Sequence, residues 1–141
     1  MKLEKDFFTR PDVVQVAQDL LGKYLYTCHV GILTRGIITE TEAYSGTNDK
    51  ACHAHLNRRT KRTEIMYHEG GVAYVYLVYG IYNLFNIITN VKGRPDAVLV
   101  RSADMHDLEI APSVQAIGRA GAGTNNIPVG AMSARGVPVV N

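Results

Sequence analysis

The stretch 72-VAYVYLVYGIYNLFNIIT-89 decides the fold class. It is dense in Val, Ile, Tyr and Phe, the residue types that β-strands favour, and its one interruption is Gly80. We interpret it as strand, with Gly80 marking a bend or a bulge. Because side chains alternate across a strand, one face carries Tyr74, Tyr76 and Val78, and the other carries Val75, Leu77 and Tyr79.

Working outward from this strand, the pattern predicts a mixed α+β chain. Apolar residues from Val13 to Leu21 recur at helical spacing, with Thr9 as the expected N-cap and Gly22 as the expected end of the helix. Strands are expected at residues 24–28 and 33–41 with Gly31 in the turn between them, and a short buried strand at residues 97–100 ends at Arg101.

Composition narrows the class of protein further. With 141 residues, 46% hydrophobic and 20% charged, the chain fits one soluble domain. No apolar run reaches the roughly 18 residues of a membrane span, and no secretory signal opens the chain. Two cysteines are too few for a disulfide framework, which favours a reducing cytoplasm. The formal charge of +2 permits a nucleic-acid partner without requiring one.

Residues 40-ETEAYSGTNDKACHAH-55 gather titratable side chains in one short stretch. Glu40 and Glu42 are two apart on a strand and therefore face the same side, which suits acid–base chemistry or an ordinary solvated edge. A zinc site is a weaker hypothesis, because no paired ligand motif accompanies the candidates Cys52, His53, His55 and His68. We therefore predict no metal.

A basic run follows, 57-NRRTKR-62, and precedes the tyrosine-rich strand in the chain. Basic side chains contact phosphates and aromatic faces stack on unpaired bases, so this neighbourhood favours DNA binding. A solvated charge cluster beside core tyrosines would give the same pattern. The candidate phosphate contacts are Arg58, Arg59, Lys61 and Arg62.

Over about residues 3–101 the chain resembles the alkyladenine (3-methyladenine) DNA glycosylase family. The segments that carry the resemblance are DLLGKYL, GIITETEAYSG, ACHAH, RRTKRTEIMY and AYVYLVYGIYNLFNIIT. The resemblance implies that Glu42 activates water, and that the damaged base lies against Tyr44, His53 and Tyr76. It also implies that Tyr79 fills the gap left by the flipped nucleotide, that Asn86 rejects the wrong purine, and that Arg101 has a positioning role.

Residues 95–141 instead resemble the N-terminal substrate domain of D-3-phosphoglycerate dehydrogenase. We therefore expect two parts, a glycosylase-like half-domain at residues 1–101 and a Gly/Ala-rich segment at residues 102–141. The expected fold is α+β, a curved and mainly antiparallel sheet with peripheral helices, incomplete at its C-terminal end. Such a sheet would leave an edge at which the chain could self-associate.

The resemblance implies a bacterial-type cytoplasmic repair enzyme that acts on the chromosome. Its substrate would be duplex DNA containing alkylated bases, its reaction hydrolysis of the N-glycosidic bond of a flipped purine, and no cofactor would be required. Two alternatives stay open from the sequence. One is a DNA-binding module without catalysis, and the other is an inactive dehydrogenase fragment related to a phosphorylated hydroxy acid.

Overall fold

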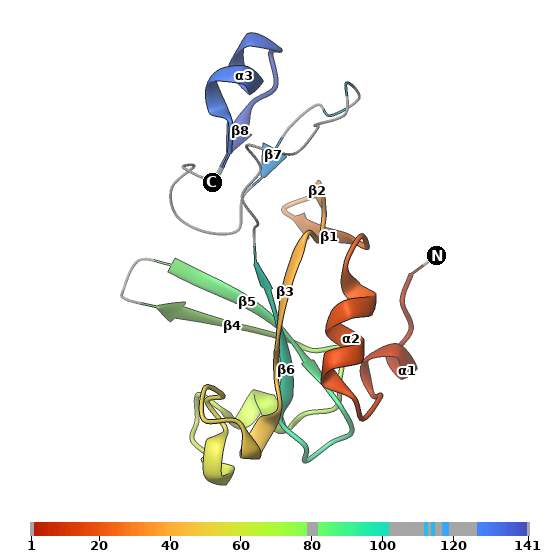
Figure 1. Ribbon diagram of the computed structural model, residues 1–141, viewed down its shortest axis with the longest axis vertical. Helices are drawn as coiled ribbons and strands as arrows, with labels where there is room; N and C mark the ends of the chain where they lie inside the picture. The colour runs from red at the N-terminus through yellow and green to blue at the C-terminus, as the bar shows by residue number, and fades with distance from the viewer. Residues whose placement is uncertain are drawn as a thin grey trace.

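The computed structural model describes residues 2–78, 82–101, 112, 114, 117–118 and 127–140. Its centre is an open four-stranded sheet with strand order β3-β6-β5-β4 and antiparallel pairing throughout (Figure 1). The described elements are α1 (Lys5–Phe8), α2 (Val13–Leu20), β1 (Tyr24–His29), β2 (Ile32–Ile37), β3 (Glu40–Tyr44), the 3-10 turns η1 (Gly46–Asn48), η2 (His55–Asn57) and η3 (Glu64–Tyr67), β4 (Ala73–Val78), β5 (Tyr82–Thr89), β6 (Asp96–Arg101), β7 (Ile117–Gly118), α3 (Val129–Ala134) and β8 (Val139–Val140). The α+β class with a mainly antiparallel sheet is confirmed.

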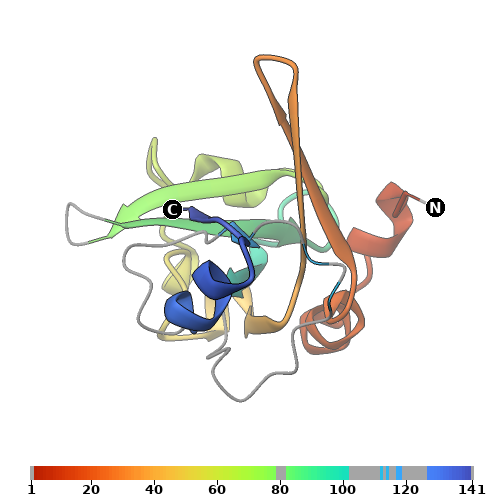
Figure 2. The same cartoon turned by 90° about the horizontal axis from the view of Figure 1, so that it is seen from above.

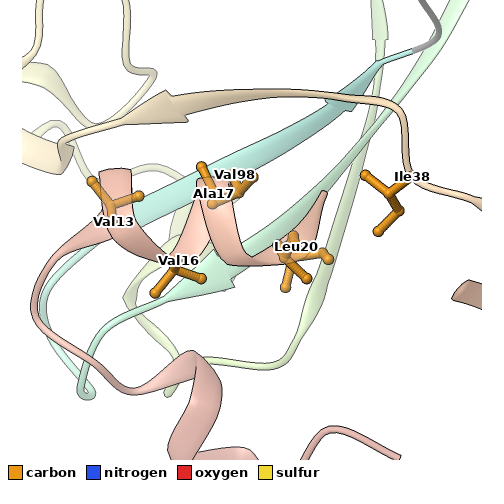
Figure 3. Close-up of a cluster of buried hydrophobic side chains, with 7 residues drawn as sticks. Val13, Val16, Ala17, Leu20, Ile38 and Val98 are labelled. Carbon is orange, nitrogen blue, oxygen red and sulfur yellow. The ribbon is translucent and has the colours of Figure 1, made fainter. Parts of the chain in front are cut away.

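Helix α2 covers one face of this sheet. Its N-cap is Asp12, whose carboxylate accepts hydrogen bonds from the backbone N–H groups of Val14 and Gln15, both at 3.0 Å. The predicted cap, Thr9, is wrong, because Thr9 ends the short helix α1 and its N–H bonds to the Lys5 carbonyl. The buried side of α2 consists of Val13, Val16, Ala17 and Leu20, which pack with Ile38, Ile87 and Val98 (Figure 3).

The predicted strand 33–41 divides into two strands that belong to different sheets. β2 pairs with β1 in a hairpin that projects away from the central sheet (Figure 2), and β3 begins afresh at Glu40. The break comes at Ile38, whose N–H donates to the Lys23 carbonyl and whose carbonyl accepts from Gly22. Because the Ile38 side chain is buried against α2, the chain is fixed there before it enters β3.

The tyrosine-rich stretch also holds two strands rather than one bent strand. β4 and β5 pair antiparallel, and their register sets Tyr74 opposite Asn86. The next pairings set Asn86 opposite Leu99 on β6, and Leu99 opposite Glu42 on β3. Directly paired residues share a face, so a row of side chains crosses the sheet from β4 to β3. We call this side the site face; the other side packs on α2.

The site face has a core of its own. The segment between β3 and β4 folds over it, and the buried residues there are Cys52, Ala54, Met66, Tyr67, Tyr74, Ile88 and Ala97. Apolar residues of the opposite parity, such as Ala43, Phe85 and Val100, pack on the helix side. Alternation along the strands therefore separates the packing of α2 from the construction of the candidate site.

The described C-terminal residues form a small unit. Strands β7 and β8 pair in parallel beside α3, and a separate cluster of Ile127, Met132 and Val137 is buried there. The predicted boundary after Arg101 stays a prediction. None of the helices in the described part of the chain has the length and apolar character that crossing a bilayer requires.

Candidate active site

A small hollow lies on the site face, between the sheet and the segment that follows β3. Its volume of about 20 Å³ has room for a single water molecule. The hollow therefore provides an aromatic floor rather than a closed chamber for a purine. Its lining residues are Tyr44, Ala51, Cys52, His53, Met66, Tyr74, Tyr76, Asn86 and Ala97.

Strand β3 supplies a carboxylate beside this floor. Glu42 and Tyr44 are two residues apart and so share the site face, and the Tyr44 hydroxyl donates a 2.9 Å hydrogen bond to Glu42 Oε1. Both side chains are half-buried. The phenol thus restrains a carboxylate that remains reachable from solvent.

Three aromatic side chains form most of this aromatic floor. The His53 ring meets the Tyr76 ring edge-on with 4.5 Å between centroids, and Tyr74 and Tyr76 lie 5.2 Å apart. His53 Nδ1 is 3.0 Å from the Tyr74 hydroxyl. Burial lowers the pKa of His53, and the positive charges of Arg62 and Arg58 lower it further, so the imidazole is neutral near pH 7.

Asn86 is fixed at the back of the hollow. It is 3% exposed, and its Nδ2 donates to the backbone carbonyls of Tyr74 and Leu84, both at 3.3 Å. An amide held in this way has a defined orientation, which is what discrimination between ring edges requires.

The basic side chains of residues 58–62, the basic loop, differ in their contacts. The Arg59 guanidinium makes a bidentate pair with Glu64 at 2.8 and 2.7 Å and stacks on Tyr67 at 4.6 Å. Arg62 turns instead to the hollow, with its guanidinium 5.2 Å from the centre of the Tyr76 ring. Arg58 and Lys61 are exposed. The two arginines with contacts therefore already have partners within the chain.

The structure brings together five of the six residues that were predicted for catalysis and base binding. Tyr44, His53, Tyr76 and Asn86 line the hollow, and Glu42 joins it through Tyr44. Tyr79 lies outside the described residues. The backbone of Arg101 ends β6 opposite Glu40, and its side chain lies outside the described part of the chain.

The prediction missed Tyr74 as a member of the site. Tyr74 is 5% exposed and holds the His53 ring, whereas the sequence interpretation assigned it no role. The signal was present, since Tyr74 and Tyr76 have the same parity on one strand.

The environment of Cys52 does not favour a thiolate nucleophile. The Cys52 thiol is buried, its Sγ lies 3.9 Å from the Pro95 carbonyl oxygen, and burial raises its pKa, so the reactive thiolate is disfavoured. Within the described residues, no three His, Cys, Asp or Glu side chains gather in a way that would hold a metal ion.

Comparison with known proteins identifies the family. The family model described as Methylpurine-DNA glycosylase (MPG) matches residues 6–121. A Chlamydia pneumoniae protein named "Putative 3-methyladenine DNA glycosylase" is 49% identical over 100 residues, 71% of this chain and 51% of that protein. Proteins of the same name from Natranaerobius thermophilus and Clostridium novyi are each 48% identical, over 74% and 73% of this chain and 52% and 50% of their own lengths.

The chain spans about half the length of the curated relatives it matches. The family model nevertheless covers most of the chain, including every strand of the central sheet. The chain belongs to the methylpurine-DNA glycosylase family.

Proposed function

We propose that this chain carries the base-excision chemistry of a DNA-3-methyladenine glycosylase and releases alkylated purines from duplex DNA. The names of its relatives support this activity class. The observation that carries the proposal is the pairing of Glu42 with Tyr44 at the rim of an aromatic hollow that Asn86 closes from behind.

The reaction needs a water, a proton acceptor and a good leaving group. The oxygen of the water bonds to C1′ of the sugar while the C1′–N bond breaks. The electron pair of the C1′–N bond leaves with the base. Glu42 accepts the proton of the water, and the Tyr44 hydroxyl holds the carboxylate in place for this step. An alkylated purine is already cationic, so it departs with little help from an acid.

The hollow would bind the flipped base by stacking. The rings of Tyr44, His53 and Tyr76 offer electron-rich faces, which favour an electron-poor, cationic purine. Asn86 would read the edge of the base. The small hollow supplies one side of this binding site only, so the base is held between the floor and its own DNA strand.

The remaining residues would hold the DNA. Tyr79 would fill the gap left by the flipped nucleotide, and Arg101 would position the reacting nucleotide. Arg58 and Lys61 are exposed and suited to phosphate contacts. Arg59 would contact a phosphate only after its hydrogen bonds to Glu64 break. The substrate would be the bacterial chromosome, which implies a cytoplasmic site of action.

Replacement of Glu42 by Gln is the direct test. We expect Glu42→Gln to abolish release of 3-methyladenine from alkylated duplex and to change the DNA dissociation constant by less than about threefold, because only a transition-state interaction is lost. Glu40→Gln is the matched control, since Glu40 lies two residues away on the same strand, while the hydroxyl of Tyr44 donates its hydrogen bond to Glu42. Equal loss in both variants would exclude Glu42 as the base.

A second candidate function is DNA binding without base release. The exposed side chains of Arg58 and Lys61 favour it, because they can contact phosphates whether or not a base is released. The same assay separates the two: DNA binding with no base released by the unaltered chain would leave a binding module. We also propose that the open edges of β3 and β4 permit self-association.

A further inference from the structure

The environment of His53 assigns its tautomer. Nδ1 lies 3.0 Å from the Tyr74 hydroxyl, and Nε2 lies 3.4 Å from Nη2 of Arg62. A guanidinium can donate hydrogen bonds but cannot accept them, so Nε2 must be the acceptor of this contact. The ring proton of a neutral His53 is therefore on Nδ1, and this N–H donates to the oxygen of Tyr74.

Two contacts hold the Arg62 guanidinium in this place. The hydrogen bond to Nε2 is long, and stacking of the same group over Tyr76, 5.2 Å from the ring centre, restrains it independently. Arg62 itself is exposed, so its charge lies in water at the rim. His53 is only partly exposed and lines the hollow, so a charge on its imidazole would lie within the hollow.

We propose that Arg62 is a positioning residue, which fixes His53 as the neutral Nδ1–H tautomer and so keeps positive charge out of the hollow that stacks a cationic base. The benefit to base release rests on the proposed function. The tautomer does not, because every contact that determines it lies within the protein. Arg62 thereby acts on specificity rather than on DNA phosphate.

The groups that face His53 agree with this assignment. Strand β4 presents Tyr74 and Tyr76, and burial raises the pKa of Tyr76, so this ring stays a neutral phenol. Arg62 and Arg58 provide the positive charge, and both oppose protonation of the imidazole. If His53 were protonated, its positive charge would repel the positive charge of an alkylated purine.

The tautomer can be measured directly without DNA. In ¹⁵N-histidine-labelled protein, long-range ¹H–¹⁵N spectra distinguish Nδ1–H from Nε2–H, and a His53→Asn variant assigns the signals. His55 is an internal reference, since its Nδ1 lies 3.2 Å from the Thr47 carbonyl, which can only accept. We expect both histidines to be Nδ1–H in the unaltered chain.

Variants then test the role of Arg62. Arg62→Ala should convert His53 to a mixture dominated by Nε2–H and move its pKa up towards the ordinary value, leaving His55 unchanged. Lys61→Ala is the matched control and should alter neither histidine. Tyr74→Phe removes the acceptor and should also release the tautomer. An Nε2–H His53 in the unaltered chain, or an Arg62→Ala variant with unchanged spectra, would overturn the proposal.

The consequence for activity is a separate measurement. Relative to the unaltered chain, Arg62→Ala should lose about threefold or more in release of a cationic base near pH 6 and less near pH 8, because its His53 protonates at higher pH. Arg62→Lys keeps the charge and should recover part of the loss. A pH-independent loss would assign Arg62 to phosphate contact instead, and absence of all base release would contradict the proposed function while the spectra still decide the tautomer.

Discussion

At the scale of single residues, Asp96 shows how burial governs a charge behind the site. It opens β6 with 8% of its surface exposed, and its Oδ2 accepts a 2.7 Å hydrogen bond from Asn90 Nδ2. Burial raises the pKa of Asp96, more than the Asn90 bond and nearby Arg94 lower it. The folded chain therefore holds this proton to higher pH than the unfolded chain does.

This shift gives a pH dependence with a definite sign. The contribution of Asp96 to the free energy of unfolding is fully present below its ordinary pKa and is lost as pH rises through its higher folded pKa. Asp96→Asn keeps an oxygen for Asn90 and should remove that loss, raising stability at neutral pH by up to about 1 kcal/mol. Denaturant titration from acid to neutral pH would show it.

The control for this variant has the opposite sign. Hydrogen bonds from Arg10 and Gln15 lower the pKa of Asp19, so its contribution is lost as pH falls. Asp19→Asn should therefore flatten the acid side of the stability profile. A loss of stability at neutral pH in Asp96→Asn would show that the buried charge is stabilising.

At the scale of elements, the segments that connect the strands hold the N-terminal helix against the central sheet. The end of α1, the start of the β4 segment and the turn after β5 meet at one point, where Asn90 N–H donates to Phe8 O and Gly70 N–H donates to Asn90 O. This contact ties the N-terminal segment to the sheet. A Cβ on Gly70 would collide with the backbone of Phe8, with 2.7 Å to its carbonyl carbon, and with Asn90 O at 3.1 Å.

We therefore expect Gly70→Ala to destabilise the chain by about 1–3 kcal/mol, because backbone on both sides must move. Gly36→Ala is the matched control: Gly36 lies in exposed β2 and nothing lies within 4 Å of its added Cβ. Thermal unfolding of the two variants beside the unaltered chain measures the difference. Equal midpoints for all three would mean that the N-terminal segment is not part of the cooperative unit.

At the scale of the whole molecule, the apolar residues are divided among separate clusters. Two of them sandwich the central sheet, one beneath α2 and one on the site face. The third, around Met132, has three buried members among the described residues and belongs to the C-terminal part of the chain. The two clusters of the sheet are larger within the same described residues, so we expect cooperative protection to be concentrated in the central sheet.

Hydrogen exchange tests this division. Amides of α3, including Met132, whose N–H bonds to Pro128 O at 3.0 Å, should exchange faster than those of β5. Light scattering on the same sample should show species larger than a monomer, because β3 and β4 are the edge strands of the sheet within the described residues. A monodisperse monomer with equal protection in α3 and β5 would contradict both the two-part division and the self-association.

Local patterns in the sequence predicted the strand segments of the central sheet, though not all of their ends. Alternation placed Tyr74 and Tyr76 on one face, and the family resemblance singled out Asn86, which lines the hollow, and Glu42, which accepts a hydrogen bond from Tyr44. Such patterns could not predict the register between strands, because the register depends on pairings between residues that are distant in the chain. The Glu42–Leu99–Asn86–Tyr74 row is of this kind.

The errors have the same origin. The strand break depends on the burial of Ile38 against α2, which no alternation within residues 33–41 reveals. Thr9 and Asp12 are both good capping residues, and only the observed start of α2 at Val13 decides between them. Arg59 is one of several arginines in the sequence, but in the fold it is paired with Glu64.

The two-faced sheet also has a genetic consequence. On the proposed function, we expect neighbouring codons of β3 and β5 to be under different selection. Changes at Ala43, Phe85 or Ile87 should mainly reduce the amount of folded protein, whereas changes at Glu42 should leave a folded chain with reduced base release. A saturation-mutagenesis map that scores abundance and repair separately would therefore show two interleaved stripes with a period of two codons. Compensating mutations would be found within a stripe, and seldom between the stripes.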